Sequence, residues 1–209
     1  ISDTLLEATP LIFTGLAVAF AFRCGLFNIG AEGQILVAGL AAAWVGTWSG
    51  LPWIVHIPLT LIAAAVAGGL WVFIPAFLRA KLGVHEVITT IMFNYIAFSF
   101  TAYFNLKVLA EPGQIQTPDI ASRAHLWRFS NLWDMHSYFN FGFVIALVVA
   151  AFIYYLLWKT TIGYEIRAVG NNPDAAEYGG IDSTKMILLA LLISGALAGF
   201  AGGIEVLGV

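Results

Sequence analysis

Six apolar segments, each about as long as a membrane-spanning helix, constrain this chain more than any other feature. They lie at about 5–22, 30–48, 54–78, 86–104, 139–158 and 186–207. A helix needs about 20 apolar residues to cross a bilayer. Helix is the expected form because backbone groups in lipid must bond within their own segment, and the alternation typical of a membrane barrel is absent. The sequence therefore predicts an all-α, polytopic transmembrane helix bundle with about six spans.

The composition excludes several classes of protein. Of the 209 residues, 60% are hydrophobic and 10% are charged, whereas a soluble domain carries about 25% charged residues. The net charge of −3 argues against nucleic acid as a partner. A single cysteine, Cys24, excludes an internal disulfide and a cysteine metal cluster. The chain starts at Ile1 without a cationic leader and ends in an apolar run at Val209, so we expect 1–209 to be a fragment of one longer transmembrane domain.

Lysine and arginine predict which span ends share a side of the membrane. If the spans alternate in direction, one side holds Arg23, Arg79, Lys81, Lys159, Arg167 and Lys185, and the other holds Lys107, Arg123 and Arg128. The positive-inside rule makes the first side cytoplasmic. The segment 159–185 is therefore predicted to be a cytoplasmic loop, and 105–138 an extracytoplasmic loop.

The polar loop before the last span carries the start and stop signals of a short helix. Asn172 is a good capping residue, Pro173 fits the first helical position, and Asp174 favours the positive end of the helix dipole. The pair Gly179–Gly180 ends such a helix. An earlier turn is expected at about 163–169. The pattern predicts one or two short helices that another protein docks onto; an ordinary solvated loop is the alternative.

Polar side chains at the start of the second span form another candidate site. Asn28, Glu32 and Gln34 border an apolar run and are interspersed with glycines. Polar residues at such a position usually face a protein interior or an aqueous path, and a broken helix exposes backbone groups to a solute. The alternative is structural: Asn28 caps the helix and Glu32 lies in its first turn.

The fourth span carries a third candidate set. Glu86, Thr90 and Asn94 are four residues apart and share one helical face, which predicts a stripe turned toward the bundle interior or a pore. The threonine is equally able to bond its own backbone, and Asn94 is suited to either an interhelical bond or a solute contact. In the last span, Gly195, Gly199 and Gly203 predict close helix packing.

Three segments resemble a known family of transport proteins. They are 27–34 (FNIGAEGQ), 86–95 (EVITTIMFNY) and 167–176 (RAVGNNPDAA), the last followed by Gly179-Gly180-Ile181. They are similar to permease subunits of bacterial ABC importers, in the nucleoside and general sugar branch of the branched-chain amino-acid/simple-sugar permease superfamily. The segments fall in the family's order, and relative to that family we expect the fragment 1–209 to lack an early span and several later ones.

The resemblance implies a permease subunit that moves a polar small molecule, such as a nucleoside or a simple sugar, by alternating access. Its implied partners are a second permease subunit, two cytosolic ABC ATPase subunits and an extracytoplasmic solute-binding protein, in the lipid bilayer of a bacterial inner membrane. The sequence has no G-x-x-x-x-G-K-[ST] phosphate loop. ATP is therefore expected on the partner subunits, and this chain is expected to be no enzyme, with no catalytic residue, cofactor or metal of its own.

The resemblance implies one set of site residues, and the polar patterns described above supply a second set. ATPase coupling is expected from Gly163, Tyr164, Glu165, Arg167, Gly170, Asn171, Asn172, Pro173, Asp174, Ala175, Ala176 and Gly179. The candidates for the solute path are Asn28, Glu32, Gln34, Glu86, Thr90 and Asn94.

An ion-coupled secondary transporter is the alternative function. Buried acids suit proton or sodium coupling, but Glu32 and Glu86 lie at span ends and no acid lies in mid-span. An intramembrane enzyme would need a nucleophile with a base, or a metal cluster, and the sequence offers no such constellation.

Overall fold

The computed structural model describes residues 2–48, 50–109, 120–121, 124–127 and 140–208. Its elements are α1 (Ser2–Arg23), α2 (Ala31–Gly46), α3 (Trp53–Leu82), α4 (Glu86–Phe104), the π-helical turn η1 (Asn105–Leu109), α5 (Gly142–Lys159), α6 (Thr161–Asn171), α7 (Pro173–Tyr178) and α8 (Ser183–Gly208). Within the described residues there is no strand, so the predicted all-α bundle is confirmed.

Each predicted span coincides with a helix. Five of these helices are long and apolar enough to cross a membrane, and the sixth, α2, is a shorter apolar helix of 16 residues. The helix α2 is short because the chain first turns through 24–30, where Gly25 has a φ of 72°. The predicted loop 105–138 lies mostly outside the described residues.

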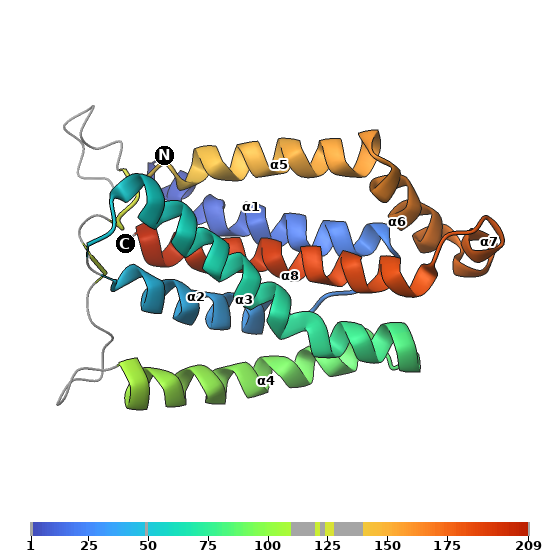
Figure 1. Ribbon diagram of the computed structural model, residues 1–209, viewed down its shortest axis with the longest axis horizontal. Coiled ribbons are helices and arrows are strands. Elements are labelled where there is room, and N and C mark those ends of the chain that lie inside the picture. Colours follow the sequence, from blue (N-terminus) through green and yellow to red (C-terminus); the bar gives the residue numbers. More distant parts are fainter. Residues whose placement is uncertain (1, 49, 110–119, 122–123, 128–139, 209) are drawn as a thin grey trace.

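Helix α8 is the centre of the bundle. It packs against α1, α2 and α3, while α4 lies outside α2 and α3, and α5 lies outside α1 (Figure 1). A Cβ on Gly195 or Gly199 would clash with backbone of α3, namely the carbonyl oxygens of Gly68 and Ala64. The predicted close packing along the glycines of the last span is therefore confirmed, since only a missing side chain allows this approach.

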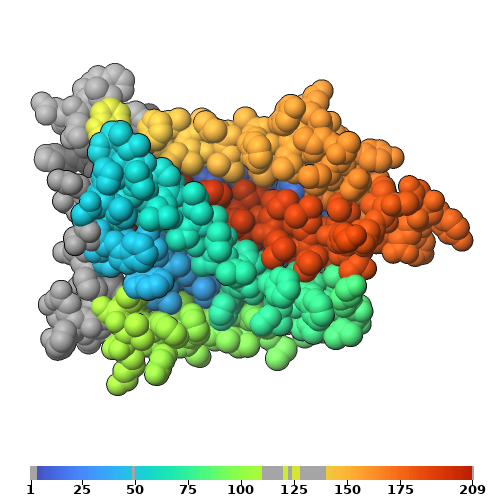
Figure 2. All heavy atoms as spheres, viewed as in Figure 1, coloured from blue at the N-terminus to red at the C-terminus, as the bar shows by residue number. Residues whose placement is uncertain are grey.

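The six cations assigned to one side of the membrane do lie at one end of the bundle. Helices α1, α3 and α5 end there, and α4 and α8 begin there. Helices α6 and α7 extend beyond this end (Figure 2). The two ends of the chain lie at the opposite end of the bundle (Figure 1).

Candidate coupling and solute-path sites

Helices α6 and α7 fill the segment predicted for coupling, and a side chain caps each of them. The Thr160 hydroxyl oxygen accepts a hydrogen bond from the Gly163 N–H at 3.1 Å, and Asn172 Oδ1 accepts one from the Ala175 N–H at 3.1 Å. Pro173 is the first residue of α7, and Gly180, with a φ of 84°, follows its end. The capped helix predicted from the sequence is confirmed, and the earlier turn is a full helix of 11 residues.

The inner face of α6 packs against the ends of α1 and α5. Ile166 and Val169 are almost fully buried and belong to the same apolar cluster as Leu26 and Leu157. This packing follows from the apolar spacing of α6, which places both side chains on one face of the helix. Helix α6 is therefore attached to the spans along its length.

Two glycines let the backbone of α6 touch neighbouring backbone. A Cβ on Gly163 would clash with the carbonyl oxygen of Leu156, and one on Gly170 would clash with the carbonyl oxygen of Arg23. On the other side of this contact, a Cβ on Gly25 would lie 3.2 Å from the carbonyl oxygen of Gly170. Helix α6 thus presses directly on the turn that follows α1.

Helix α7 forms the exposed tip of the molecule (Figure 2). The Tyr178 side chain is 96% exposed, whereas Ala176 faces inward and is buried. The other coupling candidates divide in the same way: Tyr164, Asn171, Asn172, Pro173, Asp174, Ala175 and Gly179 are exposed, Glu165, Arg167 and Gly170 are half-buried, and Gly163 is buried.

Arg167 lies against the spans and away from this tip. Its guanidinium carbon is 4.3 Å from the centre of the Trp158 ring at the end of α5, within cation–π range. Its Nε donates a hydrogen bond to the Gly163 carbonyl oxygen at 3.3 Å.

The junction of α7 and α8 is held by local polar contacts. The Ser183 hydroxyl donates to the Pro173 carbonyl oxygen at 3.1 Å and ties the start of α8 to the start of α7. Lys185 Nζ lies 2.9 Å from Asp182 Oδ2, and hydrogen bonding from Lys185 lowers the pKa of the Asp182 carboxyl. The Ser183 hydrogen bond links α7 to the last span, and the Lys185–Asp182 pair lies at the start of that span.

Asn28, Gln34 and Ser194 form a buried cluster between the turn after α1 and the middle of α8. Asn28 Nδ2 donates to Ser194 Oγ at 2.8 Å and to Gln34 Oε1 at 3.0 Å, and Gln34 Nε2 donates to Asn28 Oδ1 at 3.0 Å. Asn28 Oδ1 also accepts from the Gly30 N–H at 3.1 Å, and the Ser194 hydroxyl donates to the Ala17 carbonyl oxygen at 2.7 Å. The cluster therefore joins α1, α2 and α8.

Asn94 of α4 makes hydrogen bonds to the same turn and to the start of α2. Its Oδ1 accepts from the Gly33 N–H at 2.9 Å, and its Nδ2 donates to the Ile29 carbonyl oxygen at 3.1 Å. Within the part of the chain that the structure describes, the Thr90 hydroxyl bonds only its own helix, with the Glu86 carbonyl oxygen at 2.7 Å as its nearest acceptor. Of the two roles considered for Asn94, the interhelical bond is present.

Glu86, at the start of α4, contacts the same turn through a backbone N–H. One carboxylate oxygen accepts from the Phe27 N–H at 3.2 Å, and the other lies 3.2 Å from Arg79 Nε. The carboxylate is buried and paired, which is the arrangement that makes a buried charge tolerable. Arg79 is thus an internal partner of Glu86.

Five of the six predicted solute-path residues are buried in this one region. Glu32 is the exception, since it lies exposed in the first turn of α2. Asn28 does not cap α2, because Gly30 occupies the cap position and no side chain bonds there. Two residues of this region, Ser194 and Arg79, were not predicted as site residues. Ser194 could have been found as a hydroxyl in the middle of a span, and Arg79 as a cation close in sequence to the span-end carboxylate of Glu86.

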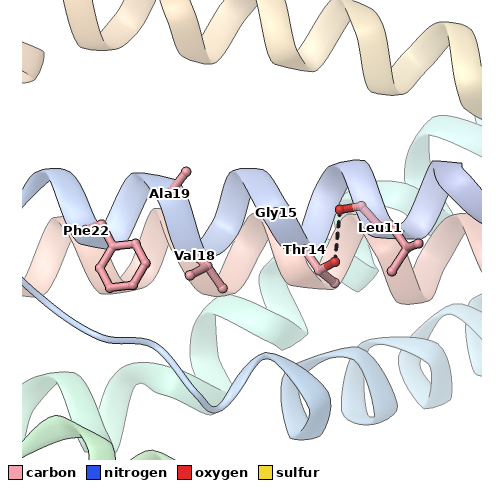
Figure 3. Close-up of a pocket in the computed structure, with 6 residues that line it drawn as sticks. All are labelled: Leu11, Thr14, Gly15, Val18, Ala19 and Phe22. Carbon is pink, nitrogen blue, oxygen red and sulfur yellow. Dashed lines mark hydrogen bonds between the residues drawn. The ribbon is translucent and has the colours of Figure 1, made fainter.

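A shallow apolar hollow follows the outer face of α1 (Figure 3). It is lined by Leu11, Thr14, Gly15, Val18, Ala19 and Phe22. The Thr14 hydroxyl bonds the Pro10 and Leu11 carbonyl oxygens of its own helix. Without a charged or free polar group, this hollow suits a lipid chain or an apolar side chain and does not suit a polar solute.

Comparison with known proteins supplies the family. The model of the branched-chain amino acid transport system / permease component family matches residues 1–209. The chain belongs to this family. With five helices long and apolar enough to cross a membrane, this family member is a multi-pass inner-membrane protein.

Individual relatives point to one branch of the family. The chain is 48% identical over 209 residues to the guanosine ABC transporter permease protein NupP of Bacillus subtilis, covering 100% of this chain and 60% of NupP. It is 40% identical to the nucleoside ABC transporter permease protein NupB of Lactococcus lactis, covering 97% and 57%. It is 34% identical to the glucose ABC transporter permease protein TsgB13 of Haloferax volcanii, covering 100% and 57%.

The chain therefore spans somewhat more than half the length of these relatives. No solved structure matches it.

Proposed function

We propose that this chain is part of a permease subunit of an ATP-driven importer, and that it moves a polar small molecule by alternating access. The carrying observation is the capped pair α6–α7, which is rigidly attached to the span ends and exposes one short helix beyond them. Such a shape suits the transfer of a push from a docked protein to the spans. A nucleoside is the first solute to test, because the relatives NupP and NupB are named for guanosine and nucleosides; a simple sugar is the second, because TsgB13 is named for glucose.

The proposed partners follow from the family. Two cytosolic ABC ATPase subunits would receive α7, a second permease subunit would complete the path, and an extracytoplasmic binding protein would deliver the solute. The side that carries α6 and α7 is then cytoplasmic. ATP would be bound and hydrolysed by the ATPase subunits, and this chain would serve transport without catalysing a reaction.

The proposed route of coupling runs from α7 through α6 to the turn at 24–30. Gly170 and Gly25 bring α6 against this turn, and Asn28 and Asn94 fasten the turn to α8 and α4. A rigid element moves as a body, so a push on α7 would reach the buried polar cluster. In this role the buried amides shape the path, and Glu32, which is exposed, is the candidate for direct contact with the solute.

Transport assays with the full-length complex test the class of transporter. The permease, its ATPases and its binding protein would be reconstituted in vesicles, and uptake of labelled guanosine and glucose measured with ATP inside the compartment that holds the ATPases. The expected result is ATP-dependent uptake that persists when ionophores remove proton and sodium gradients. Uptake that needs an ion gradient and no ATPase would support the secondary transporter instead.

A substitution on α7 tests the docking surface. Ala175 is exposed, so Ala175→Trp adds bulk to the docking face without disturbing the packing of the buried Ala176. We expect solute-stimulated ATP hydrolysis and uptake to fall at least tenfold, because misplacing one docking helix by the width of an indole costs more than about 1.4 kcal/mol of interface energy. Ala151→Trp on the exposed side of α5 is the matched control and should leave both rates within twofold.

A further inference from the structure

Two arginines from different helices converge on one indole ring at the end of the bundle that carries α6. The guanidinium carbon of Arg23 lies 5.5 Å from the centre of the Trp158 ring, and that of Arg167 lies 4.3 Å from it. Because both cations are within cation–π reach of one ring, they are within about 10 Å of each other. Lys159, the residue after Trp158, adds a third positive charge to the same border.

This concentration of positive charge has no internal counter-ion in the described part of the chain. The ion pairs there join Arg79 and His85 to Glu86, and Lys185 to Asp182. Like charges at this separation repel, and the repulsion grows where lipid and protein lower the dielectric constant. A bound anion that contacts both guanidinium groups would offset the repulsion, and the guanidinium fork matches phosphate oxygens.

The surroundings of the two arginines are those of a membrane surface. Both α1 and α5 end here, and α5 exposes Tyr154 and Tyr155 one turn before the exposed indole of Trp158. Aromatic and basic side chains at span ends are typical of the headgroup layer. Phe22, which is also exposed, precedes Arg23 and begins the apolar hollow on α1. A ligand here would find charge at the span ends and apolar surface along the spans.

We propose that Arg23, Trp158 and Arg167 form a binding site for the phosphate of an anionic phospholipid. A lipid fits better than an acidic protein segment because Arg167 turns back toward α5, away from the exposed tip at α7. Such a lipid would join the ends of α1 and α5 to α6. The site depends on the chain lying in a membrane and is independent of what the protein transports.

Native mass spectrometry of the full-length protein tests this site. The protein would be purified in detergent, supplied with equal amounts of phosphatidylglycerol and phosphatidylcholine, and examined for retained lipid. We expect one phosphatidylglycerol on the wild-type protein. Arg23→Gln and Arg167→Gln should each weaken its retention about fivefold, because a basic side chain near a membrane contributes about that factor to the binding of acidic lipid.

Matched controls separate the site from general charge effects. Lys81→Gln removes an exposed cation from the same end of the bundle and should leave retention unchanged. Arg23→Lys keeps the charge without the planar fork and should give an intermediate retention. Thermal stability of each variant, measured alongside, reports whether the fold is intact.

Three results would overturn the proposal. The first is equal retention of both lipids by the wild-type protein, and the second is equal loss from Lys81→Gln and Arg23→Gln. The third is displacement of the lipid by inorganic phosphate or by bound ATPase subunits, which would assign the arginines to a free anion or to a protein partner. The lipid measurement needs no transport, so its failure would leave the proposed import function standing.

Discussion

At the scale of single residues, two buried asparagines determine how the chain passes from α1 to α2. Asn28 hydrogen-bonds Gln34 of α2 and Ser194 of α8, and Asn94 of α4 hydrogen-bonds the Gly33 N–H of α2 and the Ile29 carbonyl oxygen of the turn. Both asparagines are nearly inaccessible. Backbone groups in a turn inside a membrane have no water to bond, so the amide side chains supply the partners. The motif at 27–34 is therefore explained by the turn, whether or not a solute ever touches it.

Removing one amide tests this role. In Asn94→Leu the Gly33 N–H and the Ile29 carbonyl oxygen lose their partners. We expect a loss of about 1–3 kcal/mol in the free energy of unfolding, the usual cost of an unsatisfied buried group. Unfolding of the full-length protein in mixed micelles would measure it. Thr101→Val is the control, since the Thr101 hydroxyl bonds only its own helix among the described residues. A cost equal to that of Asn94→Leu would contradict the role of Asn94.

Cys24 reports on the contact between α6 and the turn. The Cys24 side chain is buried in the apolar cluster that also contains Ile166 and Val169 of α6. Burial hides the thiol from reagents, so alkylation by a maleimide at pH 8 should be at least tenfold slower in the native protein than in the unfolded protein. Mass spectrometry of the peptide that contains Cys24 gives the rate; rapid labelling in the native protein would mean that α6 is not seated as described.

At the scale of elements, α6 connects the ends of the spans to α7 and packs firmly against α1 and α5. Its buried face, its two glycine contacts and its capped start fix it to α1 and α5. Helix α7, with one buried residue, makes far less contact with the rest of the molecule. This difference in packing suits a coupling element in which α6 is fixed to the spans and α7 is exposed to a partner.

A substitution at Gly170 tests whether the contact between α6 and the end of α1 is needed for coupling. Gly170→Ala forces α6 away from the Arg23 carbonyl oxygen, so we expect ATP hydrolysis to continue while uptake per ATP falls at least fivefold. The ratio of the two rates in the reconstituted complex is the measurement. Gly15→Ala is the control, because a Cβ on Gly15 meets nothing within 4 Å. The same ratio in both variants would argue against a route through Gly170.

The helices and their ends could largely be predicted from the sequence. The spans, the cap at Asn172, the stop at Gly179–Gly180 and the glycine packing of α8 follow from local chemistry and spacing. Contacts between distant segments could not be predicted, because no local pattern says that Ser194 meets Asn28 or that Arg79 meets Glu86. For the same reason the packing of Arg167 against Trp158 could not be predicted, and the role of Arg167 in ATPase coupling stays a prediction.

At the scale of the whole molecule, the bundle is polarised along its length. The cations and the pair α6–α7 lie at one end, and the ends of the chain lie at the other (Figure 1). The buried polar cluster is joined to α8 through Ser194, and α6 contacts Gly25 in the same turn that contains Asn28. Under the proposed function, this arrangement would let a partner docked on α7 act on the solute path.

The most direct test of the account is crosslinking from the tip of α7. Tyr178 is 96% exposed, so a photoreactive residue in its place would capture whatever lies against α7 in the full-length complex in cells. We expect an adduct with an ATPase subunit that forms on the cytoplasmic side. Labelling of the same position by a membrane-impermeant reagent added outside intact cells, with no ATPase adduct, would contradict it.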